Sequence, residues 1–175
     1  MGVRDVATLD HYLPKTKYAT IVVTPINIVP ACRDCSSNKD NKDATVVDEE
    51  VWHPYYDDYR YIRWLYAEIK EDSSPIVIFY VDISSCEISA EDETKIKNSF
   101  TIFKLSKLYG IHDAKDLGDM NDLMRGLKRN GGDEVVRQYL NMLYESCKKA
   151  DTNSYRTALY EALKEREWYI EEYLS

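Results

Sequence analysis

Glycine and proline are scarce in this sequence, and the glycine-rich motifs of several common enzyme classes are missing. Six glycines and five prolines occur among 175 residues. They form no G-x-x-x-x-G-K-[ST] loop, which binds nucleotide phosphates, and no G-x-S-x-G turn, which exposes a serine nucleophile. The sequence therefore excludes P-loop nucleotide hydrolysis and elbow-type serine hydrolysis, and we do not expect an enzyme of either kind.

A long hydrophobic stretch is also missing. No run approaches the ~20 apolar residues that a membrane-spanning helix needs. Residues 1–13 (MGVRDVATLDHYL) lack the apolar segment of a secretory signal peptide. We therefore expect a cytoplasmic, intracellular protein without a membrane partner. In that compartment cysteines normally stay reduced, here Cys32, Cys35, Cys86 and Cys147.

Basic charge is in short supply as well. The chain has 23 Lys and Arg against 31 Asp and Glu, which gives a formal net charge of −8. The densest basic cluster, Arg125, Lys128 and Arg129, closes a predicted helix, where cations suit the helix dipole. A nucleic-acid backbone would be repelled by the average field, so the net charge argues against nucleic acid as a partner. RNA binding stands as a third alternative because aromatic rings and arginines stack on bases.

Aromatic residues are what the sequence has in excess. Seven of the fifteen residues from Trp52 to Tyr66 are Tyr or Trp (WHPYYDDYRYIRWLY). Pro54 suits the first turn of a helix, which we expect to continue to about Glu71. Such a helix buries one stripe of side chains at spacings of three and four, here Tyr59, Ile62, Tyr66 and Ile69.

The other aromatic residues of this helix are expected at the surface, beside two arginines. Exposed Tyr, Trp and Arg dominate binding hot spots. The sequence thus favours a non-enzymatic accessory protein, with a composition common among viral proteins, that binds a protein partner or a second copy of itself. The predicted binding residues are Trp52, Tyr55, Tyr56, Arg60, Tyr61, Arg63 and Trp64. The alternative is half-buried packing, since Tyr rings fill cores while their hydroxyls reach water.

The order of predicted elements indicates an α+β fold that is mainly helical. Residues 18–29 (YATIVVTPINIV) and 75–84 (PIVIFYVDIS) are rich in β-branched residues and predict a small sheet of two or three strands. With the aromatic helix between these strands, residues 17–84 are compatible with a β-α-β unit. The polar residues 31–50 predict a mobile loop.

The C-terminal part, residues 111–175, predicts a helical bundle with short connections. Another helix is predicted before residue 111. Ser89 and Asp92 form the capping box at its start, and Gly110 suits its end. Gly131-Gly132 ends the next helix. The whole chain, residues 1–175, is long enough for one domain with its own core.

The motif Cys32-Arg-Asp-Cys35 is a candidate for metal or redox chemistry. As half of a zinc site it would need two further ligands from Cys86, His53 and His11. As a redox dithiol it would need a helix after the strand, and SSNKDNKD is a poor helix start. Ordinary loop cysteines are the third interpretation.

Asp82 follows an apolar strand, a place where carboxylates bind Mg²⁺ in phosphoryl-transfer and nuclease folds. Asp is also common in turns at strand ends. The alternative function is therefore a small metal-dependent enzyme, with zinc or magnesium, or a zinc-binding protein. The main interpretation needs no cofactor.

Overall fold

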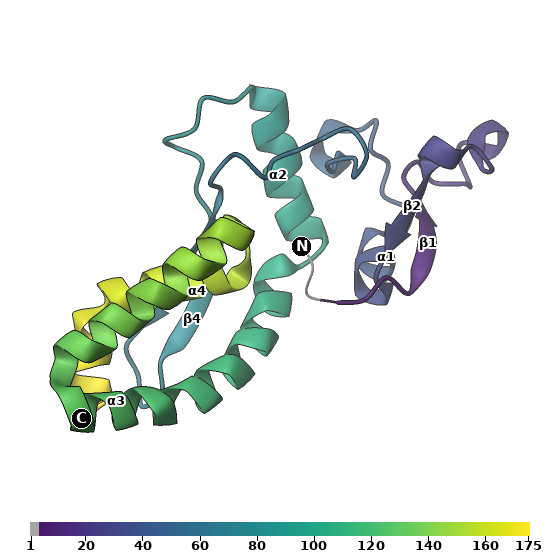
Figure 1. Ribbon diagram of the computed structural model, residues 1–175. Helices are drawn as coiled ribbons and strands as arrows, with labels where there is room; N and C mark the ends of the chain where they lie inside the picture. The colour runs from purple at the N-terminus through teal and green to yellow at the C-terminus, as the bar shows by residue number, and fades with distance from the viewer. Residues whose placement is uncertain (1–3) are drawn as a thin grey trace. The chain divides into compact units, whose positions relative to one another are not determined.

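The computed structural model describes residues 4–175, apart from the side chain of Lys115. Helices hold 54% of these residues, and two antiparallel sheets of two strands each complete the described fold (Figure 1). The expected α+β, mainly helical fold is confirmed. Contacts divide the described chain into an N-terminal unit, residues 4–61 and 85–105, and a C-terminal unit, residues 62–84 and 106–175. The expectation of one domain stays a prediction.

The N-terminal unit is built on a strand pair and a short helix. Strand β1 (Thr8–His11) pairs with β2 (Ile28–Ala31), so that Thr8 lies opposite Ala31 and His11 opposite Ile28. Helix α1 (Arg33–Lys39) follows β2 and contacts β1. The other elements of this unit are three 3₁₀ turns and one helix: η1 (Ala19–Ile21), η2 (Pro25–Asn27), η3 (Val47–Glu49) and α2 (Ala90–Ile102).

Two predictions for this unit are wrong in detail. Residues 18–29 do not form one strand, because Pro25 has no N–H to give a ladder and instead starts η2, so only Ile28 and Val29 join β2. Residues 31–50 are not all loop, because the Cys32 side chain accepts the N–H of Cys35 and caps α1. The β-α-β unit is wrong too, since both described sheets are antiparallel.

The predicted helix over residues 54–71 is also wrong. Residues 54–64 form turns and irregular backbone, and β3 (Leu65–Lys70) follows. Carboxylates near the expected helix start bond locally instead: Asp57 accepts the N–H of His53, and Asp58 accepts that of Arg60. Such bonds compete with helical ones.

In the C-terminal unit, β3 pairs with β4 (Ile76–Val81), which confirms the strand predicted over residues 75–84. Polar side chains close both edges of this pair. Asn153 Oδ1 accepts the N–H groups of Trp64 and Leu65 at 2.9 and 3.2 Å. On the other edge, Ser106 Oγ donates to the carbonyl of Phe79 at 3.0 Å.

The helices of this unit are α3 (Leu105–Ala150), α4 (Tyr155–Glu165) and a π-helical turn, η4 (Tyr169–Tyr173). The predicted helical C-terminal part is confirmed, and α3 is broken at Gly132, near the predicted helix end. Gly110 lies within α3, so it does not end a helix; α2 ends at Ile102. No helix among the described residues has the length and hydrophobicity to cross a membrane.

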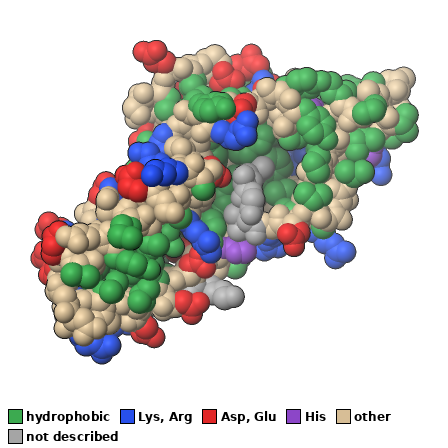
Figure 2. All heavy atoms as spheres, in the orientation of Figure 1, with side chains coloured by type: hydrophobic (Ala, Val, Ile, Leu, Met, Phe, Trp, Pro, Cys, Tyr) green, Lys and Arg blue, Asp and Glu red, His purple; other side chains and the backbone are tan. Residues whose placement is uncertain are grey.

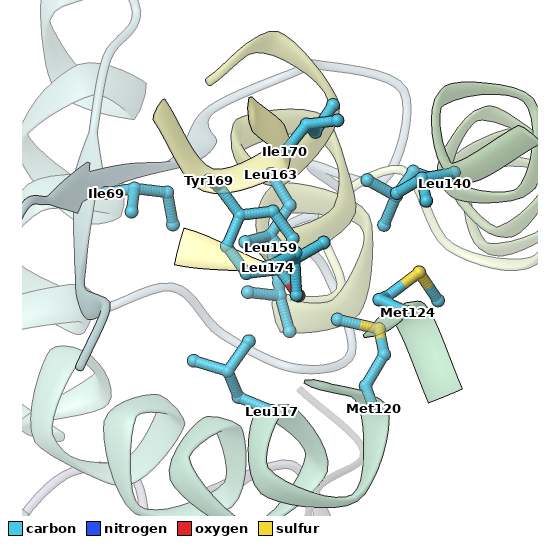
Figure 3. Packing of buried hydrophobic residues seen from close by; sticks show 11 residues of the cluster. Ile69, Leu117, Met120, Met124, Leu140, Leu159, Leu163, Tyr169, Ile170 and Leu174 are labelled. Carbon is cyan, nitrogen blue, oxygen red and sulfur yellow. The ribbon is translucent and has the colours of Figure 1, made fainter. Parts of the chain in front are cut away.

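The core of the C-terminal unit forms where the inner face of β3 meets α3, α4 and η4 (Figure 3). Inside it, the Tyr169 hydroxyl donates to Asn121 Oδ1 at 2.8 Å, so the buried phenol is satisfied. The fully or nearly buried members are Ile69, Leu117, Met120, Met124, Val136, Leu140, Leu159, Leu163, Tyr169, Ile170 and Leu174.

Candidate functional site

The aromatic segment is divided between the surface and the two cores. Tyr55, Tyr56 and Tyr61 are exposed, Tyr61 to 86%. Trp64 is only 5% exposed, so the expectation that it lies at the surface is wrong. It is buried because it leads into β3, where Asn153 holds its N–H.

The remaining predicted binding residues make contacts within their own unit. Trp52 is half-buried, with its ring 6.2 Å from that of Tyr59. Arg63 is also half-buried and donates to Glu161 at 2.6 Å, so it joins the segment before β3 to α4. Arg60 is exposed and makes two side-chain bonds to Asp58. A binding role for these residues stays a prediction.

Four rings form a cluster against the β1–β2 pair, here called the tyrosine cluster: Tyr12, His53, Tyr55 and Tyr56. The His53 ring lies 4.3, 5.5 and 4.7 Å from the other three rings, in that order. His53 Nε2 lies 3.0 Å from the carbonyl of Ile26. The Tyr55 hydroxyl donates to the carbonyl of Ile28 at 3.0 Å. Tyr55 is thus an exposed ring with a fixed position.

A second feature of the N-terminal unit is the loop that follows His11, the last residue of β1. Asn27, at the end of this loop, is 3% exposed. Its Oδ1 accepts the N–H of Leu13 at 2.6 Å, and its Nδ2 donates to the carbonyls of Leu13 and Ile21 at 3.2 and 3.4 Å. One buried amide therefore bonds three backbone groups of the loop, two on Leu13 and one on Ile21.

Lys39, the last residue of α1, holds the beginning of the same loop. Its side chain is 4% exposed, and Nζ donates to the carbonyl of His11 at 2.8 Å. Burial lowers the pKa of Lys39, and the nearby Asp10 and Asp43 carboxylates oppose that effect. Burying a lysine is costly unless it is bonded in this way.

Asp43 is the third buried polar side chain around this loop. It accepts hydrogen bonds from the Lys17 ammonium and the Tyr18 hydroxyl, both in the loop. Hydrogen bonds, first from the Thr45 backbone and then from side chains, hold the pKa of Asp43 at about 2. Asn27, Lys39 and Asp43 together we call the loop clamp.

The clamp fixes the surroundings of a half-buried imidazole. His11 Nε2 lies 3.1 Å from the carbonyl of Val22. A carbonyl only accepts, so in the neutral ring Nε2 carries the hydrogen and Nδ1 is the nitrogen able to take a proton. The preceding carboxylate, Asp10, is also half-buried and accepts the N–H of His11 at 2.8 Å. The imidazole of His11 and the carboxylate of Asp10 thus belong to consecutive residues at the end of β1.

The sequence interpretation missed this site. It took His11 as an ordinary surface residue or a possible zinc ligand, and it took the polar run after Cys35 as solvated loop. The available signal was weak: Asp10-His11 follows a short alternating segment, and Lys39 and Asn27 look like ordinary surface residues.

The other predicted metal ligands make local contacts. Cys32 Sγ accepts the N–H of Cys35 at 3.4 Å, and Asp82 Oδ1 accepts from the N–H and hydroxyl of Ser84 at 2.9 and 2.7 Å. These bonds to Ser84 lower the pKa of Asp82. Across residues 4–175, no three or more His, Cys, Asp or Glu side chains are grouped to hold a metal ion. Zinc and magnesium at these residues remain predictions.

Comparison with known proteins finds a similarity to Protein ea31 of Escherichia phage lambda. The two are 30% identical over 135 residues, which cover 75% of this chain and 43% of the phage protein. The chain thus spans less than half the length of that relative. No family model matches the chain, and no solved structure matches it. The similarity to a phage protein agrees with the viral character that the composition suggests.

Proposed function

We propose that this protein is a phage-type accessory protein that hydrolyses phosphodiester bonds, with His11 and Asp10 as its reacting groups. The loop clamp is the observation that carries the proposal. Three buried polar side chains hold the loop that begins at His11, although burying them costs stability. Proteins retain such costs at functional sites, where reacting groups need fixed positions.

His11 has the chemistry of a general base. Imidazole is the side chain that exchanges protons most readily near neutral pH. Nδ1, left without a hydrogen when Nε2 donates to Val22, is the atom that would take the proton of an attacking water. Lys39 Nζ donates to the backbone carbonyl of His11, so the backbone that carries the ring is held in place.

Asp10 has the chemistry of a magnesium ligand. Mg²⁺ in phosphoryl-transfer sites is commonly held by one or two carboxylates, with water and the substrate's own phosphates completing its shell. A single carboxylate at residue 10 is compatible with such a site, which does not require a group of three or more potential ligands, and none is found among the described residues. When bound, the ion would stabilise the charge that develops on the phosphate.

The charge of the first 45 residues differs from that of the chain as a whole. They hold six Lys or Arg and five Asp or Glu, whereas the whole chain carries −8. The segment that contains the reacting groups is therefore not itself acidic, which lowers the electrostatic barrier to a phosphate substrate.

The test is a cleavage assay on end-labelled DNA and RNA, single- and double-stranded, with Mg²⁺ or Mn²⁺ at low salt. We expect cleavage that EDTA abolishes, and a loss of about 100-fold or more in His11→Ala and Asp10→Asn. His112→Ala is the matched control, because His112 is half-buried on α3 in the other unit. A folded wild type that cleaves none of these substrates contradicts the proposal.

A second candidate function is protein binding through exposed tyrosines, favoured by Tyr55, Tyr56 and Tyr61. Tyrosine gives a large contact area at little entropic cost, and the Tyr55 ring is already fixed. Exposed apolar side chains of the same unit include Val23 and Ile26. Figure 2 shows hydrophobic side chains gathered at the surface over the segment drawn in purple in Figure 1.

For this candidate we expect Tyr56→Ala with Tyr61→Ala to abolish association with a partner from infected cells, or with a second copy seen by light scattering, while the circular dichroism spectrum stays unchanged. Tyr80→Ala, at an exposed tyrosine of β4, is the matched control. Trp64→Ala should instead destabilise the fold by about 3 to 5 kcal/mol, since Trp64 is buried. Association that survives the double change rejects the candidate.

A further inference from the structure

We propose that Cys32 and Cys35 are a reversible dithiol–disulfide couple at the start of α1. The two side chains are in contact: the Cys35 N–H donates to Cys32 Sγ at 3.4 Å, and the Cys35 thiol is hydrogen-bonded to the Cys32 side chain. Two cysteines form a disulfide when their Cβ atoms come to about 3.5–4.5 Å, and a C-x-x-C spacing at a helix start permits this approach. All four cysteines are reduced in the structure.

The surroundings leave this pair available for exchange. Both cysteines are half-buried, so a small reagent can reach them. Neither belongs to a group of three or more potential metal ligands within residues 4–175. The residues after Cys35, which did not predict a helix, nevertheless continue the short helix α1.

The two sulfurs have different roles. Cys32 Sγ accepts the backbone N–H of Cys35 at 3.4 Å, and we assign it as the attacking atom. Burial, followed by the hydrogen bond to Cys32, raises the pKa of Cys35 to about 12, so Cys35 keeps its proton until the second step. It is the resolving cysteine.

The chemistry is a thiol–disulfide exchange with a low-molecular-weight disulfide such as oxidised glutathione. The Cys32 thiolate attacks one glutathione sulfur, a mixed disulfide forms, and one glutathione thiolate leaves. Cys35 then attacks Cys32 Sγ, gives its proton to solvent and expels the second glutathione thiolate. Two protein thiols are oxidised, and one glutathione disulfide is reduced to two thiols.

The test uses the full chain in glutathione buffers of graded ratio, quenched in acid, alkylated and mapped by mass spectrometry. We expect two thiols per molecule to be lost together, in a peptide with Cys32 linked to Cys35. Cys86 and Cys147, which are also half-buried, serve as internal controls and should stay alkylated. The readout is thiol state, so it is independent of phosphodiester cleavage.

Single substitutions separate the roles. Cys35→Ser should accumulate one glutathione on Cys32, because nothing resolves the mixed disulfide, whereas Cys32→Ser should take up none on Cys35. Four alkylated thiols in fully oxidised glutathione would overturn the proposal. So would equal glutathione uptake at all cysteines, or bound zinc that protects both thiols until a chelator removes it.

Discussion

Asp113 is a carboxylate whose buried surroundings favour its protonated, neutral form. It is 3% exposed, and its Oδ1 has no hydrogen-bond partner among the residues that the structure describes. Burial, with a smaller contribution from the nearby Asp116 charge, raises the pKa of Asp113 from 3.8 to about 7. Buried polar groups are normally bonded, so this residue lowers the stability of the C-terminal unit whenever it ionises.

The pH dependence follows from that raised pKa. Well below the unfolded pKa of 3.8, Asp113 is protonated in both states; as pH rises to about 7 the unfolded state ionises first, so stability falls. We expect Asp113→Asn to be more stable than wild type by about 2 to 4 kcal/mol above pH 7, with the gain vanishing below pH ~3. Urea unfolding at several pH values measures this difference.

Asp116→Asn is the control with the opposite sign. Burial opposes ionisation of Asp116, but bonds from the Arg156 guanidinium and the Tyr155 hydroxyl outweigh it and lower the pKa. Its stabilising contribution is present at neutral pH and is lost as pH falls, so Asp116→Asn should be less stable than wild type at pH 7. If both variants shift stability in the same direction, the account of Asp113 is wrong.

The cap at the start of α2 was predicted correctly from the sequence, because a cap depends only on residues a few positions apart. Ser89 Oγ accepts the N–H of Asp92, as the predicted cap requires. Asn27 and Lys39 were missed because their burial depends on residues far along the chain. The bond from Lys39 to His11 spans 28 positions.

At the scale of elements, the break in α3 depends on Gly132. Its backbone angles, φ 74° and ψ −174°, lie in a region that only glycine adopts without strain. We expect Gly132→Ala to destabilise the protein by about 1 to 3 kcal/mol in urea unfolding.

Gly126→Ala is the matched control for that prediction. Gly126 lies inside α3, and a Cβ added there meets no atom within 4 Å. This change should stabilise the helix by about 0.5 to 1 kcal/mol. Equal effects of the two alanines would mean that the break at Gly132 needs no glycine.

The aromatic segment shows why element type was harder to predict than element existence. Leu65 and Ile69 are four residues apart, a spacing that serves both a helix stripe and one face of a strand. Pairing with β4 decides for the strand over the helix, because Phe79 of β4 lies opposite Ala67 on the same inner face. Strand pairing is non-local, whereas β4 itself was predicted from its continuous β-branched run.

At the scale of the molecule, the proposed chemistry belongs to one unit. His11, Asp10, the loop clamp, the tyrosine cluster and the Cys32–Cys35 pair all lie in residues 4–61 of the N-terminal unit. The stretch similar to the phage lambda protein covers 75% of the chain, more than either unit contains. The similarity therefore reaches into both units.

The fold class could be predicted at this scale, because helical periodicity in residues 111–175 outweighs the short strands. The site could not. Asp10 and His11 are recognised as a candidate site only when α1 brings Lys39 to the end of β1. No pattern in the neighbouring sequence predicts that contact.

Chemical rescue of His11→Ala by imidazole is the most direct measurement of the central claim. The cleavage rate of labelled nucleic acid with Mg²⁺ or Mn²⁺ is followed as imidazole is added. We predict that imidazole restores part of the lost rate in His11→Ala and leaves Asp10→Asn unchanged, since a free base replaces only the missing base. Cleavage by His11→Ala at the wild-type rate, or no cleavage by wild type at all, would contradict the assignment of His11 as the general base.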